Sequence, residues 1–191
     1  MINKDCKKET EKMKNVVDIR DEFFDNDNKI SAQSMKDLIW HIENDPRPTR
    51  AISLVTDARL MELVPLIAKH LDHEDDFVRE LTVGCLVGGL KLAEYAEKAL
   101  NMAQEDPDSG PCVLATSSLG SVINKVDSIL QQRIAMHLYG VIINPEYDEI
   151  DKRCAFDSIL EAMDISVIQR RAIGYDENHD LVKQFKAKYG I

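Results

Sequence analysis

The sequence predicts an all-α fold, and three of its features indicate this class. Glycine (8 residues) and proline (6 residues) are scarce and fall at intervals, as they do in turns between helices. Apolar residues recur at the 3.6-residue period of amphipathic helices, whereas alternating β-branched runs are nearly absent. The apolar content of 44% is sufficient for a continuous core. We therefore expect residues 1–191 to form a single helical domain.

The first predicted elements are a capping helix and a helix hairpin. Residues 8–24 are charged on one side, and their apolar side carries Met13, Val16, Val17, Ile19, Phe23 and Phe24. We assign residues 1–30 to an N-terminal cap. Helices over 31–43 and 46–57 form the first hairpin. Trp40 lies off the apolar stripe of its helix, so we expect it to be partly exposed and to contact a partner, because tryptophan is frequent among binding hot spots.

The second hairpin has the clearest pattern. Its first helix, 60–71, has a single apolar stripe that consists of Leu60, Leu63, Val64, Ile67 and Leu71. Asp75 and Asp76 follow in an acidic turn, where they can cap the next helix and interact with its positive end. A second apolar stripe then runs from Val78 to Leu86.

Two further hairpins and a C-terminal helix complete the chain. Residues 92–104 pair with 111–123, residues 128–143 pair with 150–163, and the last helix covers 178–189. The hairpins recur about every 33 to 37 residues, a spacing typical of solenoids. A hairpin with two apolar faces must stack on its neighbours to bury both. We expect a short right-handed α-solenoid whose four repeats and C-terminal cap are 31–57, 58–90, 91–124, 125–164 and 165–191.

The stretch LVPLIAKHLDHEDDFVRELTVGCL resembles the HEAT-repeat family. The matching features are a proline early in the first helix (Pro65), an acidic turn, and a Val-Arg pair (Val78, Arg79) that opens the second helix. The resemblance implies that Asp75 or Asp76 and Arg79 tie adjacent repeats together by polar contacts. It predicts a fold and leaves the function open.

The residue types that act in catalysis or metal binding are present, but the sequence motifs in which they usually act are absent. The four cysteines have no CxxC spacing, which indicates free thiols in a reducing compartment. His73-Glu74 is the one His-Glu pair, whereas the HEAT-repeat enzyme deoxyhypusine hydroxylase binds two irons through several such pairs. No Gly-x-Ser-x-Gly elbow surrounds Ser117 or Ser121. We therefore predict no catalytic residue, metal or cofactor, and keep a HEAT-type enzyme, such as a bilin lyase or a metal-dependent hydroxylase, as the alternative.

Charge and hydropathy restrict the partners. The 34 acidic and 24 basic side chains give a net charge of −10, which disfavours nucleic acid and suits a basic protein. No export signal and no run of about 18 apolar residues is present, so we expect a cytoplasmic protein without a membrane span.

The leading hypothesis is a non-catalytic protein-interaction module with an acidic concave face. It is a scaffold or adaptor, or an immunity or antitoxin-like inhibitor of a basic protein, and a monomer or weak homo-oligomer. In HEAT stacks the second helices line the concave side, and residues 146–164 alone hold seven acids. The residues that we expect to contact the partner are Trp40, Arg47, Arg50, Asp57, Asp76, Glu80, Ser117, Ser121, Asn124, Asp148, Asp151, Asp157 and Glu161.

Overall fold

The computed structural model describes residues 13–191, and these residues form helices and turns without a β-strand. The predicted all-α class is therefore confirmed. The α-helices are α1 (Val16–Asp25), α2 (Ala32–Asn44), α3 (Thr49–Asp57), α4 (Val64–Ile67), α5 (Asp76–Val83), α6 (Ala96–Glu105), α7 (Ser109–Leu119), α8 (Ser128–Ile143), α9 (Glu149–Ala162), α10 (Val167–Ala172) and α11 (Asp180–Tyr189). Short 3₁₀ segments are η1 (Met61–Leu63), η2 (Ala68–Asp72), η4 (Ala93–Tyr95) and η5 (Ile123–Lys125), and η3 (Gly84–Gly89) is a π-helix.

The first helix begins later than predicted. Of the residues expected to start it, 8–12 lie outside the described part of the chain, as does Cys6. Residues 13–15 are not helical, and α1 begins at Val16, where the side chain of Asn15 accepts a hydrogen bond from the backbone N–H of Asp18. This N-cap defines the helix start.

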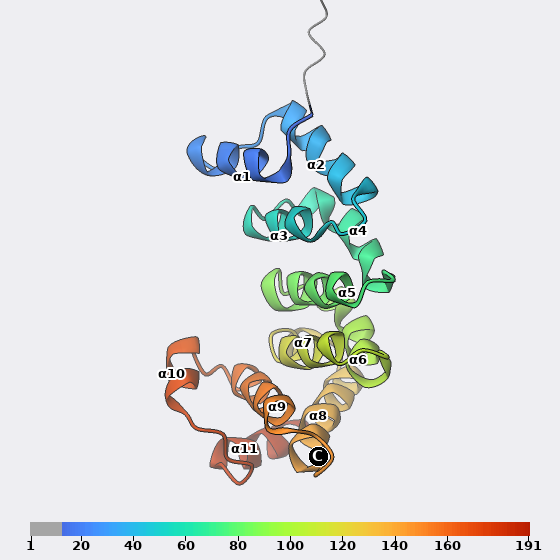
Figure 1. Cartoon of the computed structure of the whole chain (residues 1–191). Coiled ribbons are helices and arrows are strands. Elements are labelled where there is room, and N and C mark those ends of the chain that lie inside the picture. The colour runs from blue at the N-terminus through green and yellow to red at the C-terminus, as the bar shows by residue number, and fades with distance from the viewer. Residues whose placement is uncertain (1–12) are drawn as a thin grey trace, which may run out of the picture.

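The helices form two layers that follow the chain from one end to the other (Figure 1). We call α2, α4, α6 and α8 the outer layer, and α3, α5, α7 and α9 the inner layer. The column is bent, and α1 and α10 project on the side of the inner layer. The concave side of the molecule is thus lined by the inner layer.

One apolar core runs through the whole described chain, from Val16 in α1 to Tyr189 in α11. Its largest fully buried side chains include Phe156 of α9 and Phe185 of α11. The last helix closes its end of the core, because Val182, Phe185 and Tyr189 are all buried.

The predicted helix over 60–71 is divided into three short pieces, η1, α4 and η2. Pro65 lies in the first turn of α4. Proline has no N–H and is tolerated in a helix mainly in its first turn, so an α-helix can begin here but cannot extend through this position from Leu60. The predicted stripe is nevertheless buried from Leu63 to Leu71.

Gly120 allows α7 to approach α9 very closely. Its backbone N–H donates a hydrogen bond of 2.7 Å to the Ser158 hydroxyl. A Cβ atom at position 120 would overlap the main-chain carbonyl of Ser158. Because a main-chain atom cannot rotate away, α7 and α9 can only pack in this way when residue 120 is glycine.

We predict that Gly120→Ala destabilises the protein by about 3 kcal/mol, the upper part of the range for overpacked cores. Gly140→Ala is the matched control. Gly140 lies within α8 and has no atom within 4 Å of an added Cβ, so alanine there should stabilise by about 0.5 to 1 kcal/mol through helix propensity. Urea unfolding of both variants measures the difference, and equal effects would contradict the packing argument.

Candidate functional site

Arg79 joins three segments of the chain through its guanidinium group. Its Nε and Nη2 donate to the two carboxylate oxygens of Asp106 at 2.9 and 2.8 Å, and Nη2 also donates to Asp108 at 2.7 Å. Its Nη1 donates to the carbonyl oxygens of His73 and Glu74. The α4–α5 turn is thus bound to the α6–α7 turn, and the hydrogen bonds from Arg79 lower the pKa of Asp106.

Asp75 makes the corresponding link to the preceding turn. Its carboxylate caps α5 by accepting from the N–H of the buried Val78 and also accepts 2.5 Å from Nε of Arg47. In the described residues Asp76 has no such link and is exposed. Of the turn acids named by the HEAT resemblance, Asp75 and not Asp76 connects adjacent helix pairs, and Arg79 bonds to the following turn.

The acidic residues predicted near the C-terminus are partly engaged within the molecule. Asp157 pairs with Arg153 at 3.0 Å, and Glu161 pairs with Lys91 at 2.9 Å and Arg170 at 3.1 Å. Glu161 thus joins α9 to Lys91 and to α10, whereas the partner of Asp157 lies in its own helix, and both carboxylates have a cation beside them. An acidic concave surface for a basic protein therefore finds little support at these positions.

The polar residues expected on α7 and after it are also bound internally. The Ser121 hydroxyl donates to the carbonyl of Val87 at 2.6 Å, and that of Ser117 donates to its own helix at 3.0 Å. Asn124 donates to the carbonyl of Ala162 and accepts from the hydroxyl of Tyr189 at 2.7 Å. Asn124 thus connects η5 with α9 and α11, and Ser121 connects the end of α7 with η3. No sequence pattern indicates these contacts, because the partners are distant in the chain.

The remaining predicted contact residues are dispersed. Trp40 is exposed on the outer layer, with its ring edge-on to His41. Glu80 is half-buried near Gly110. Asp148 is the N-cap of α9, and Asp151, in its first turn, is half-buried. Trp40, in the outer layer, is thus separate from the other three residues, which belong to α5 and to the start of α9.

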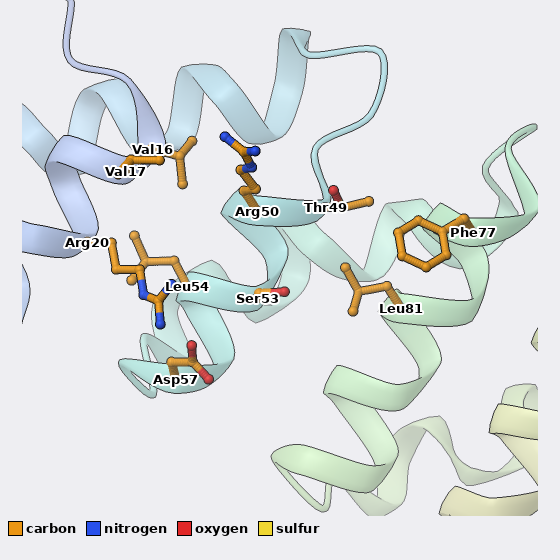
Figure 2. A pocket seen from close by; sticks show the side chains of 10 residues that line it. All are labelled: Val16, Val17, Arg20, Thr49, Arg50, Ser53, Leu54, Asp57, Phe77 and Leu81. Carbon is orange, nitrogen blue, oxygen red and sulfur yellow. The ribbon is translucent and has the colours of Figure 1, made fainter.

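The concave side does contain a pocket of roughly 500 Å³, which we call the inner groove. Helices α1, α3 and α5 form it (Figure 2). Its lining residues are Val16, Val17, Arg20, Thr49, Arg50, Ser53, Leu54, Asp57, Phe77 and Leu81.

The two sides of the inner groove differ in chemistry. Figure 2 shows Phe77 and Leu81 of α5 on one side and the guanidinium groups of Arg20 and Arg50 on the other. Phe77 is 50% exposed and Val17 is 44% exposed, although both are apolar. Of the residues expected to contact a partner, Arg50 and Asp57 line this groove.

Sequence reasoning missed Phe77 and Val17. The reason for selecting Trp40 also applies to Phe77. Each is a large apolar residue that lies off the apolar stripe of its helix, and for Phe77 that stripe begins at the next residue, Val78. A residue of this kind faces away from the core of its own helix pair.

Helix α1, which forms one wall of the groove, is held by a cluster of polar contacts around Glu22. The carboxylate of Glu22 accepts hydrogen bonds of 2.5 Å from both Lys14 and Ser34, and of 2.8 Å from the N–H of Ser31. These bonds, led by that from Lys14, lower the pKa of Glu22 to about 2. The contacts join α1 to the start of α2 and so position the groove wall.

The groups typical of catalysis are not concentrated in any site of residues 13–191. Burial is the main cause that raises the pKa of Cys85, Cys112 and Cys154, and burial lowers that of His137 to about 4. The described residues contain no group of three or more His, Cys, Asp or Glu side chains placed to hold a metal ion. None of their helices has the length and apolar character needed to cross a bilayer.

Comparison with known proteins gives no relative from which a function can be transferred: no family model, no curated protein and no solved structure matches this chain.

We predict that Arg79→Ala destabilises the fold by about 3 to 5 kcal/mol, because it leaves the carboxylate of Asp106, 7% exposed, without its cation. Arg47→Ala removes the more exposed ion pair with Asp75 and should have a much smaller effect. Chemical unfolding measures both. A loss for Arg79→Ala no greater than that for Arg47→Ala would show that the Arg79 junction is not a major source of stability.

We also predict a pH-dependent contribution from Glu22. Its pKa is lower in the folded state than the ordinary value of 4.5, so its stabilisation is complete above that pH and is lost as the pH falls towards 2. Glu22→Gln should therefore lower the melting temperature at pH 6 and have little effect near pH 2. Glu43→Gln, at an exposed position of α2, should change the melting temperature little at either pH.

Proposed function

We propose that this protein is a non-catalytic protein-binding module of the HEAT type, which holds a segment of a partner protein in the inner groove. In this proposal the chain is a short right-handed α-solenoid of four repeats, with α1 as the N-terminal cap and α10 and α11 as the C-terminal cap, and it acts in the cytoplasm as a scaffold or adaptor.

The observation that carries the proposal is the composition of the inner groove. Phe77 and Val17 expose apolar surface there, although the rest of the core is continuous and well buried. Exposed apolar side chains beside charged groups in a concave site are typical of surfaces that bind another molecule. Arg50, opposite Phe77, has no ion-pair partner among the described residues and is free to bind a ligand.

The HEAT assignment has its own support. Two layers of short helices follow the chain, and polar contacts between successive turns join neighbouring pairs through Asp75 and Arg79. Such stacks bind partners along the concave side, and the inner groove lies on this side.

A second candidate function is inhibition of a basic protein in the manner of an immunity protein. Exposed acids occur in the successive turns between outer and inner helices, and this acidic ridge consists of Asp72, Glu74, Asp76, Glu105, Asp108, Glu146, Asp148 and Glu149. Two of them are paired within the molecule, Asp72 with Lys98 and Asp108 with Arg79. Two of these turns, α4–α5 and α6–α7, are joined directly by Arg79. A basic surface would bind the ridge through long-range attraction that salt weakens.

One affinity-capture experiment tests both candidates. The wild-type protein, Phe77→Ser and Met136→Ser are immobilised and exposed to native lysate at low and high salt. Met136 is 59% exposed on α8, in the outer layer, and is the matched control. We expect a partner that Met136→Ser retains and Phe77→Ser loses at both salt concentrations.

The other outcomes are equally specific. A partner retained by all three proteins and released by salt would favour the acidic ridge and contradict binding in the inner groove. Capture that is the same for every variant and independent of salt would contradict both candidates.

A further inference from the structure

The inner groove carries a positive charge that is unusual for this chain. The protein has a net charge of −10. Five of the nine arginines of the described part form ion pairs, namely Arg47, Arg79, Arg133, Arg153 and Arg170, and four do not, namely Arg20, Arg50, Arg59 and Arg171. Arg20 and Arg50, on one side of the groove, have no ion-pair partner among the described residues. Asp57 is the one acid among the lining residues, so the groove holds two arginines against one carboxylate in an otherwise acidic molecule.

Both arginine side chains are also exposed, and few contacts within the described residues hold them in place. Arg20 is positioned over the ring of Phe24, 5.7 Å from its centroid, and Arg50 reaches into the groove from the first turn of α3 (Figure 2). A guanidinium group presents a planar fork of N–H donors that matches a carboxylate. The ligand group that fits this side of the groove is an anionic oxygen.

The opposite side requires an apolar ligand group. Phe77, half exposed, and the partly buried Leu81 form this side, and the buried side chains of Val16 and Leu54 also line the groove. A volume of roughly 500 Å³ accommodates a few large side chains. Burying an aromatic or leucine side chain there would remove apolar surface of both partners from water, which favours association.

We propose, as a deepening of the function proposed above, that the inner groove binds a segment of a partner protein in which a large apolar side chain lies next to one or more Asp or Glu residues. The apolar side chain packs against Phe77 and Leu81, and the carboxylates accept hydrogen bonds from Arg50 and Arg20. Asp57, at the same side as Arg20 (Figure 2), repels a further acid and so limits the acidic part of the ligand to the region of the two arginines. The preferred ligand of the groove is thus opposite in charge to that of the acidic ridge.

The test is a selection of random displayed peptides on the immobilised full-length protein, in parallel with Arg50→Glu, Phe77→Ser and Met136→Ser. All three positions are exposed on the surface, and circular dichroism checks that each variant is folded. We expect the wild type and Met136→Ser to enrich peptides with an aromatic or leucine residue beside Asp or Glu. Fluorescence titration with one enriched peptide should give an affinity lower by at least about tenfold for Arg50→Glu and for Phe77→Ser.

The possible results separate this inference from the function on which it rests. Enriched peptides that are apolar and basic, and that need Phe77, would overturn the acidic specificity and leave protein binding by the groove intact. Peptides whose binding is unaffected by Phe77→Ser and Arg50→Glu would overturn both. If Arg50→Glu enriches peptides in which basic residues replace the acidic ones beside the apolar residue, this result would show directly that Arg50 determines the ligand charge that the groove selects.

Discussion

The structure depends on one constraint: each pair of helices has apolar side chains on both of its faces, and only contact with the next pair removes all of them from water. The core is therefore a continuous column from α1 to α11 and not a sphere. The polar contacts and the glycines determine how the pairs meet. Arg79 fixes one turn against the next, and Gly120 lets α7 approach α9 until main-chain atoms are in contact.

The same constraint accounts for the inner groove. At the N-terminal end, α1 packs on α2 and α3, where Val16 and Ile19 are buried, and its polar contacts through Glu22 join it to the start of α2. Because α1 also borders the pocket but leaves Phe77 of α5 half exposed, a concave space remains among α1, α3 and α5. A functional surface can thus result from the way in which a stack of helices ends, without any catalytic motif in the sequence.

The apolar periodicity was sufficient to predict the helical class and most helix positions, because burial of one face is a local property of the sequence. It did not predict the division of residues 60–71, where Pro65 interrupts the hydrogen bonds of the helix. The site was harder to predict. Composition placed the acid Glu161 on a binding face, but its cations, Lys91 and Arg170, come from other segments of the chain, and only the three-dimensional structure brings them together.

The ligand proposed for the inner groove is acidic, whereas the net charge of the chain favours a basic partner. Exposed acids are spread over helices and turns of the described residues, whereas the inner groove combines apolar surface with two arginines that form no ion pair. Charges that meet a ligand at close range, in a partly desolvated site, act more strongly than the average charge of the surface, which solvent and salt screen. In the proposed binding mode, the overall charge of −10 acts on a partner at a distance, and Arg20, Arg50 and Phe77 select the segment of that partner that the groove holds.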